Sequence, residues 1–342
     1  MIIYLRYVHI LLTSSRVRQW NGLCQVAHTL AKELIDLDHT VTWFVADDDY
    51  IPSWTDDRIE FLINSEGTRT GWDALAKEVS QVQPDVVHSQ GSADAKLRAL
   101  DAPIVVTSHD NWPHSWTLGW RTAVRNLPAQ LRRQRVLQSA DQVVGVSEYK
   151  TRWLRCRGVS AKCVYNGVEI PSDSPSEGSG FLAAGTVDRR KFADLPAIWR
   201  ALHTQTDAPL DVVGKIIDQK VAEELRTLPN CEVHGEVESL TPYYEKHRTL
   251  LNPTKVDCFG LVPVEAQAHG MSVVAWDRAA MTEVVSKRNG SIITGNDVED
   301  FAQAAQRVYT NADPVVSREW VESEFSASKM AQEYQSVYQS VI

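Results

Sequence analysis

The chain has 342 residues, 43 % of them hydrophobic and 23 % charged, so length and composition predict two globular domains and exclude a disordered chain. Lysine and arginine number 35 against 44 acidic residues, which gives a formal net charge of −9. This balance argues against a chain-wide footprint for nucleic acid or an anionic membrane.

The cysteines and the hydrophobic runs bear on localisation. Five cysteines without any C-x-x-C pair argue against a disulfide framework and a structural zinc site, and they predict a reducing, cytoplasmic environment. The apolar stretch from Met1 to Leu12 is interrupted by Arg6 and His9, which argues against a signal peptide. Because no apolar run reaches 18 residues, we expect no membrane-spanning segment.

In the first half, short apolar runs alternate with helical patterns such as Cys24–Leu37. Runs that are apolar on both faces are typical of a parallel sheet covered by helices. The expected strands are Ile2–Leu5, Thr40–Val45, Asp85–His88, Ile104–Thr107 and Gln142–Val146.

The alternation stops at residues 171–180, PSDSPSEGSG, whose composition is typical of a linker. It then resumes with strands Phe181–Ala184, Leu210–Val213, Cys231–His234, Thr249–Leu251 and Ser272–Ala275, and with helices Leu195–His203 and Lys220–Leu228. The pattern predicts an α/β fold of two Rossmann-like domains. We place them at residues 1–168 and 181–326, joined by a linker at 169–180, with a helix over residues 327–342 packing back on the first domain.

Ligands of open α/β sheets bind beyond the carboxyl ends of the strands, so polar residues and glycines after strands are the candidates. Gly22 opens a helix whose amides attract a phosphate, although a tight turn is the simpler interpretation. The absence of G-x-G-x-x-G and G-x-x-x-x-G-K-[ST] argues against ordinary dinucleotide enzymes and P-loop NTPases. We interpret the run Asp47–Asp49 as a solvated loop and predict no metal site.

The stretch Asn252–Glu265, NPTKVDCFGLVPVE, is the most informative in the chain. An acidic residue, Asp257, precedes a helix that carries Glu265 eight positions later. Amides around Gly260 and Leu261 would begin that helix and face an anion, and Glu265 would accept hydrogen bonds from a diol. A helix with an incidental carboxylate is the alternative.

The spacing from Asp257 to Glu265, with F-G-L between them, resembles the E-x7-E motif of retaining family-4 glycosyltransferases of the GT-B fold. EAQAHG at 265–270 and TEVV at 282–285 resemble the segments that follow this motif in the family. PDVVH at 84–88, His109-Asp110, ADQVVGVS at 140–147 and NGV at 166–168 resemble the upstream segments. This order, over nearly the whole chain, is more specific than any single motif.

The resemblance implies two parallel sheets facing across a cleft, and a retaining hexosyltransferase that uses a nucleotide diphosphate sugar, a UDP-sugar first of all. It implies that Glu265 binds the ribose of the nucleotide. The catalytic residues it implies are His109, Asp257 and Lys191, of which the first two orient the sugar. The other donor-binding residues would be Gly22, Thr186, Arg189, Arg190, Gly214, Val237, Leu240, Phe259, Gly260 and Leu261.

Two positions depart from the family pattern. Asp257 replaces the usual Glu, and Thr186 stands where an arginine of the diphosphate clamp is expected. We expect Lys191, with Arg189 or Arg190, to stabilise the charge of the leaving diphosphate without a metal or any other cofactor. We also expect this segment to be an extended loop in which successive side chains point apart.

Two further segments concern partners. Trp112, His114 and Trp116 lie where the family admits acceptors, and stacking on a sugar and packing of the loop are equal alternatives. A helix expected over residues 120–138 is rich in arginine; we favour a solvated face, with anionic lipid, an anionic acceptor or nucleic acid as alternatives.

The expected partners are therefore a nucleotide sugar and a sugar, lipid-linked or small-molecule acceptor, without nucleic acid. Peripheral membrane contact through residues 120–138 is the alternative to a solvated face. A nucleotide-sugar epimerase of the same fold is an alternative function. A non-catalytic glycosyltransferase-like binding subunit is another, because Thr186 and Asp257 depart from the motif.

Overall fold

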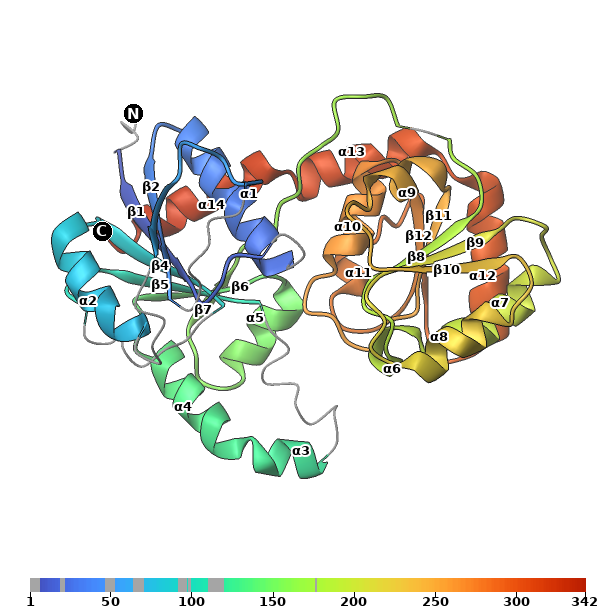
Figure 1. The fold of residues 1–342 in the computed structure, drawn as a ribbon, viewed down its shortest axis with the longest axis horizontal. Helices are drawn as coiled ribbons and strands as arrows, with labels where there is room; N and C mark the ends of the chain where they lie inside the picture. The colour runs from blue at the N-terminus through green and yellow to red at the C-terminus, as the bar shows by residue number, and fades with distance from the viewer. Residues whose placement is uncertain are drawn as a thin grey trace. The chain divides into compact units, whose positions relative to one another are not determined.

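The computed structural model describes residues 7–18, 22–46, 53–63, 71–91, 97, 100–109, 120–175 and 177–342. The chain forms two compact units (Figure 1). Unit 1 comprises Met1–Gly167 with Ala327–Ile342, and unit 2 comprises Val168–Ser326.

Unit 1 is built on a parallel sheet in the order β3-β2-β1-β4-β5-β6-β7. Its strands are β1 (His9–Ser14), β2 (Thr40–Val45), β3 (Glu60–Ile63), β4 (Val86–Gln90), β5 (Ile104–Ser108), β6 (Gln142–Gly145) and β7 (Ala161–Cys163). Its helices are α1 (Gly22–Asp36), α2 (Gly71–Val82), α3 (Trp120–Arg125), α4 (Leu127–Leu137), α5 (Glu148–Arg155) and α14 (Ala327–Gln339). The last helix, α14, packs against α1, so the carboxyl-terminal end of the chain completes the first unit.

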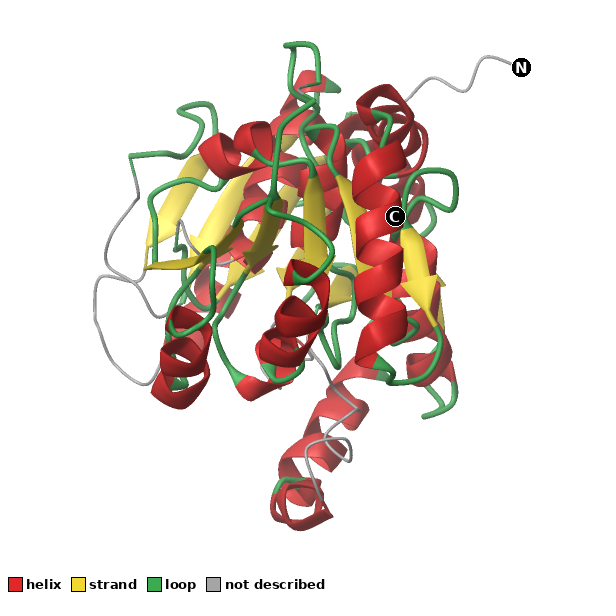
Figure 2. Cartoon of the chain, turned by 90° about the vertical axis from the view of Figure 1, so that its right-hand side faces the viewer, coloured by secondary structure: helices red, strands yellow, loops and turns green. Residues whose placement is uncertain are grey.

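Unit 2 holds a parallel sheet in the order β10-β9-β8-β11-β12-β13. Its strands are β8 (Phe181–Ala184), β9 (Leu210–Val213), β10 (Cys231–Gly235), β11 (Thr249–Asn252), β12 (Ser272–Trp276) and β13 (Ser291–Ile293). Its helices are α6 (Arg189–Phe192), α7 (Leu195–His203), α8 (Gln219–Arg226), α9 (Thr241–Lys246), α10 (Leu261–Ala268), α11 (Met281–Val284), α12 (Val298–Asn311) and α13 (Pro314–Glu324). Figure 2, coloured by secondary structure, shows strands as an inner layer among helices. Phe181, Trp199, Trp276 and Phe301 form the aromatic part of its core.

Two parallel sheets with covering helices confirm the predicted α/β fold of two Rossmann-like domains. The first described strand is β1, His9–Ser14, whereas the expected Ile2–Leu5 lies outside the described residues. A histidine is accommodated in β1 because His9 Nε2 makes a 2.9 Å hydrogen bond with Thr42 Oγ1 on the neighbouring strand. The helix expected over residues 120–138 is two helices, α3 and α4. Pro128 lies in the first turn of α4, where proline is tolerated, whereas inside one continuous helix it would remove a hydrogen bond.

The loops after β8 and β9 approach each other unusually closely. Gly214 has φ +141°, and a Cβ atom built on it would lie 2.0 Å from the carbonyl oxygen of Gly185. The amide of Gly185 donates to Val213 O at 2.9 Å, and the amide of Gly214 donates to Gly235 O at 2.7 Å. Only glycine fits at Gly214, because any side chain would separate these backbone segments.

We predict that Gly214→Ala destabilises the protein far more than the matched change Gly235→Ala. Gly235 also has a positive φ, +78°, but nothing lies within 4 Å of its built Cβ. Gly235→Ala should therefore lower the free energy of unfolding by about 1–2 kcal/mol, the cost of the left-handed backbone alone. Gly214→Ala should lower it by at least about 2 kcal/mol more, as measured by urea unfolding. Equal losses in the two variants would contradict the close approach.

Candidate functional site

The carboxyl edge of the sheet in unit 2 gathers most of the predicted donor-binding residues. From β8 the chain builds the sheet outward through β9 and β10, and then continues with β11 on the opposite side of β8. The point where strand order reverses is where open α/β sheets bind ligands. Residues 185–191 follow β8, Gly214 follows β9, residues 237–240 follow β10 and residues 257–265 follow β11. The topology therefore brings these four segments to one edge.

The segment after β8 is a short helix, α6, and not the extended loop that we expected. The helix forms because Asp188 caps it: its carboxylate accepts a hydrogen bond from the amide of Lys191 at 2.9 Å. Within this helix the three basic side chains have different neighbours.

Of these three cations, Lys191 faces the strand ends. A Cβ atom built on Gly185 would lie 2.8 Å from Lys191 Nζ, so the ammonium group lies over the glycine at the end of β8. Arg190 donates to the carbonyl oxygen of Val256 at 3.0 Å, which ties α6 to the segment after β11. The side chain of Arg189 is 78 % exposed and lies 3.6 Å from Asp218. Of the three cations, Lys191 is therefore the one at the carboxyl edge of the sheet. Thr186 is half-buried in the turn after β8.

The segment after β11 ends in the start of α10. Gly260 caps this helix with φ +97°, and Leu261 is the first helical residue, as the sequence predicted. The backbone amide of Phe259 donates to Asp257 Oδ1 at 3.3 Å, so the acidic side chain orders the turn before the helix. Helix α10 therefore begins at the edge with its first amides beside Asp257, an arrangement that suits an anion.

Glu265 lies one turn into α10, and its carboxylate has two specific neighbours. The hydroxyl of the buried Tyr244 donates to Glu265 Oε2 at 2.8 Å. Burial raises the pKa of Glu265, while the hydrogen bond from Tyr244 and the charge of Lys191 oppose that shift. Burial, together with the charge of Glu265, raises the pKa of Tyr244 well above its ordinary value, so its hydroxyl remains a donor. Tyr244 fixes one carboxylate oxygen of Glu265.

Helix α9, which carries Tyr244, is anchored to the sheet by a polar cluster. Asp211, buried inside β9, lies 2.7 Å from Lys246 Nζ and 3.1 Å from His234 Nε2. Burial raises the pKa of Asp211, but the hydrogen bonds from Lys246 and His234 outweigh it and lower the pKa overall. The ionised Asp211 thus holds the end of α9 against β9.

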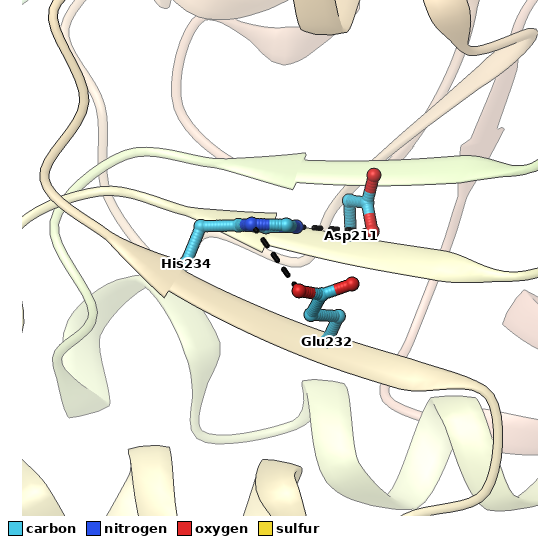
Figure 3. A group of neighbouring side chains, drawn as sticks. All are labelled: Asp211, Glu232 and His234. Atoms are coloured by element: carbon cyan, nitrogen blue, oxygen red, sulfur yellow. Dashed lines mark ion pairs between the residues drawn. The ribbon is translucent and has the colours of Figure 1, made fainter.

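Asp211, Glu232 and His234 also have the composition of a metal site. Their ligand atoms lie within 4.8 Å of one another, and Figure 3 shows the two ring nitrogens of His234 facing one carboxylate each. The ammonium of Lys246 already supplies the positive charge at Asp211. The cluster also lies within strands β9 and β10, so we interpret it as an anchor of α9.

In unit 1, His109 follows β5 and is held by a chain of hydrogen bonds. His109 Nε2 donates to Gln90 Oε1 at 2.7 Å, and Gln90 Nε2 lies 3.3 Å from His88 Nε2. His88 is fully buried and binds Thr107 Oγ1 at 2.8 Å and the hydroxyl of Tyr338 at 2.7 Å. Burial lowers the pKa of His88 to about 3, so this ring is neutral near pH 7. These contacts connect Tyr338 on α14 with His109, one of the predicted catalytic residues.

The remaining predicted residues divide into two groups. Gly22 is the first residue of α1, Val237 is half-buried in the turn after β10, and Leu240 caps α9. Trp112, His114 and Trp116, the candidate acceptor residues, lie outside the described residues, as does the run Asp47–Asp49.

Sequence reasoning did not single out Tyr244, Gln90 or Asp211. Tyr244 and Gln90 contact the predicted residues Glu265 and His109 from other elements of the fold, and Asp211 holds the helix that carries Tyr244. Spacing within one motif does not reveal such contacts. The one available signal was position: Gln90 lies two residues after the expected strand Asp85–His88.

The comparisons with known proteins divide the chain as the sheets do. Residues 20–170 match the family model described as Glycosyltransferase Family 4, and residues 180–311 match the one described as Glycosyl transferases group 1. An uncharacterized 41.2 kDa protein in the cps region of Klebsiella pneumoniae is 24 % identical over 287 residues, which cover 75 % of this chain and 79 % of that protein.

Solved structures have the same fold over nearly the whole chain. A sucrose-phosphate synthase from Thermosynechococcus elongatus aligns with a TM-score of 0.80 at 18 % identity, covering 98 % of this chain and 99 % of that one. HepE of Anabaena, in complex with UDP-glucose, aligns with a TM-score of 0.75 at 15 % identity, covering 98 % and 100 %. The lipopolysaccharide outer core galactosyltransferase WaaB aligns at 0.71 and 15 %, covering 97 % and 99 %. These likenesses establish the GT-B fold.

We predict that Tyr244→Phe raises the pKa of Glu265 further. The tyrosine hydroxyl stabilises the carboxylate, so its removal favours the protonated acid and lowers the ionised fraction near neutral pH. Tyr243→Phe is the matched control on the same helix. Carbon NMR titration of the glutamate carboxyl groups measures the change. An unchanged Glu265 titration in Tyr244→Phe would contradict the role given to this hydrogen bond.

Proposed function

Because the chain combines two glycosyltransferase domains on a GT-B fold, we propose that it transfers a sugar from a nucleotide diphosphate sugar to an acceptor with retention of anomeric configuration. The observation that carries the proposal is the carboxylate of Glu265, held by Tyr244 and close to the charge of Lys191 at the switch point of unit 2. A carboxylate and a cation at one edge suit the two polar parts of the donor, its ribose diol and its diphosphate.

In this proposal the donor lies along the carboxyl edge of unit 2. Glu265 accepts hydrogen bonds from the ribose hydroxyls with the oxygen that Tyr244 leaves available. The first amides of α10, after Gly260, bind the diphosphate or the sugar, and Asp257 orients the sugar beside them. Val237 and Leu240, in the turn between β10 and α9, are proposed to lie beside the base.

The reaction we propose is a front-face substitution. The bond from the anomeric carbon to the diphosphate oxygen breaks, the acceptor oxygen bonds to the same face of that carbon, and the acceptor proton passes to the departing diphosphate oxygen. Negative charge grows on the diphosphate as its bond breaks, and the ammonium of Lys191 stabilises it. We propose that His109 contacts the transferred sugar, as the resemblance implies. No divalent metal or other cofactor takes part in this proposal.

UDP is the nucleotide we propose, since HepE was crystallised with UDP and with UDP-glucose. The acceptor is proposed to be a sugar, a lipid-linked sugar or another small molecule. We also propose a reducing, cytoplasmic location, because the five cysteines of the sequence include no C-x-x-C pair.

We predict that Glu265→Ala weakens UDP and UDP-glucose binding by about 10- to 150-fold, the range for lost charge-assisted hydrogen bonds. Glu245→Ala, an exposed acid on α9, is the matched control and should bind as the parent does. Isothermal titration calorimetry measures both affinities. A folded Glu265→Ala protein with the parent affinity for UDP would contradict the ribose assignment.

We predict that Lys191→Ala lowers kcat by about 10²–10³, with a smaller change in KM, because its charge matters most in the transition state. Arg189→Ala should remain within about threefold of the parent, since its exposed side chain faces solvent beside Asp218. UDP release from the tightest-binding UDP-sugar, in the presence of EDTA, provides the assay.

Three outcomes of this assay would count against the proposal. Equal activity of Lys191→Ala and the parent would show that a group other than Lys191 stabilises the charge of the leaving diphosphate. Activity that EDTA abolishes and Mn²⁺ restores would replace the metal-free mechanism. A parent protein that binds UDP-sugars but releases no UDP, with or without candidate acceptors, would favour the non-catalytic binding subunit.

A further inference from the structure

Helices α3 and α4 of unit 1 expose a group of large hydrophobic side chains. The exposed fractions are 65 % for Trp120, 55 % for Val124, 44 % for Leu127 and 47 % for Leu131. These are four of the nine large hydrophobic residues that are exposed in the described parts of the chain, and they fall within twelve consecutive residues. Single exposed apolar residues scattered over a surface are normal, whereas a cluster of them on one helix pair indicates a binding surface.

These four side chains are not the ones that pack α4 against the rest of unit 1. Helix α4 already buries Gln130, Val136 and Leu137 on one face. Leu127 and Leu131 are four residues apart and lie on a face of α4 other than this buried one. Trp120 and Val124 are also four residues apart and share one face of α3. In Figure 1 α3 and the adjoining end of α4 extend away from the sheet of unit 1. The exposed apolar face is therefore additional to the face that holds the helices in the fold.

The same segment is strongly basic. Residues 120–138 contain five arginines and no aspartate or glutamate, within a chain whose net charge is −9. Arg133 donates to the carbonyl oxygen of Gly91 at 3.2 Å and so helps to attach α4 to the unit. Arg121, Arg125, Arg132 and Arg135 are exposed. The guanidinium of Arg121 lies 5.4 Å from the ring centroid of Trp120, so cation and aromatic side chain form one unit of the surface.

We propose that this surface, formed by Trp120, Arg121, Val124, Arg125, Leu127 and Leu131, docks unit 1 onto an anionic lipid bilayer. Apolar side chains enter the boundary between headgroups and acyl chains, tryptophan is favoured at that depth, and arginines pair with lipid phosphates. None of the described helices combines the length and the apolarity needed to cross a membrane, so the contact is to the surface.

The apolar half of the surface distinguishes this partner from nucleic acid. A nucleic-acid face needs cations and polar or stacking groups, and it gains nothing from exposed Val124, Leu127 and Leu131. A bilayer takes up both the leucines and the arginines. The proposal extends beyond sugar transfer, and its readout requires neither donor nor acceptor.

Co-sedimentation of the full chain with vesicles tests the proposal. We expect binding to vesicles of phosphatidylcholine with phosphatidylglycerol, much weaker binding to pure phosphatidylcholine, and a loss of binding as salt is raised. Arg121→Gln with Arg125→Gln should lower the partition coefficient by about 10- to 30-fold, the product of two screened charges at an anionic surface.

Leu131→Glu should lower it by about tenfold or more, because the leucine no longer enters the interface. Val315→Glu is the matched control, since Val315 is 52 % exposed on a helix of unit 2 and should bind vesicles as the parent does. The thermal stability of both Glu variants reports that they are folded.

Three results would overturn the proposal. One is the absence of binding to anionic vesicles. Another is equal binding by the parent and Leu131→Glu. The third is a different occupant of the surface: a single-stranded oligonucleotide bound in place of vesicles, or a dimer in solution that Leu131→Glu dissociates.

Discussion

The parallel pairing of β8 with β9 on one side and β11 on the other is the constraint on which unit 2 depends. Parallel pairing puts the ends of these strands at one edge, and each must be followed by a turn that leaves room for its neighbours. Gly185 and Gly214 provide that room, and Lys191 lies over the first of them. The absence of a side chain at these glycines therefore allows both the close approach of the backbone segments and the position of Lys191.

Buried polar contacts, and not the motif residues alone, set the position of the candidate side chains in both units. In unit 2, Asp211 anchors the end of α9 and Tyr244 on that helix holds Glu265. In unit 1, contacts from α14 reach His109 through His88 and Gln90. A buried polar group without a partner costs free energy, so such networks fix one arrangement of side chains when every member is satisfied. Glu265 and His109 are thus each held by a specific hydrogen bond within their own unit.

Sequence patterns predicted the parts of the fold that local chemistry determines. Thr40–Val45 and Leu210–Val213 have the predicted bounds, because buried apolar runs between polar turns are unambiguous in a parallel sheet. The segment after β8 was predicted wrongly as extended, because the cap from Asp188 acts through a single hydrogen bond that no periodicity reveals.

The same division holds for the candidate site. The spacing from Asp257 to Glu265 and the start of α10 at Leu261 follow from consecutive residues, and so they were predictable. The partner of Glu265 is 21 residues away on another helix, and the contacts of His109 lead to a helix 250 residues from His88. Contacts between distant segments depend on how the sheet is ordered, and sequence spacing alone does not determine that order.

Hydrogen–deuterium exchange of the full chain with and without saturating UDP tests most directly whether the carboxyl edge of unit 2 binds the donor. We expect slower exchange in peptides that contain Gly185–Lys191 and Asp257–Glu265, because the nucleotide would bind their amides and suppress local opening of the edge. Peptides from the core helix Leu195–His203 should exchange as they do in the free protein. Protection confined to segments outside the carboxyl edge of unit 2, or no protection at saturating UDP, would contradict the account.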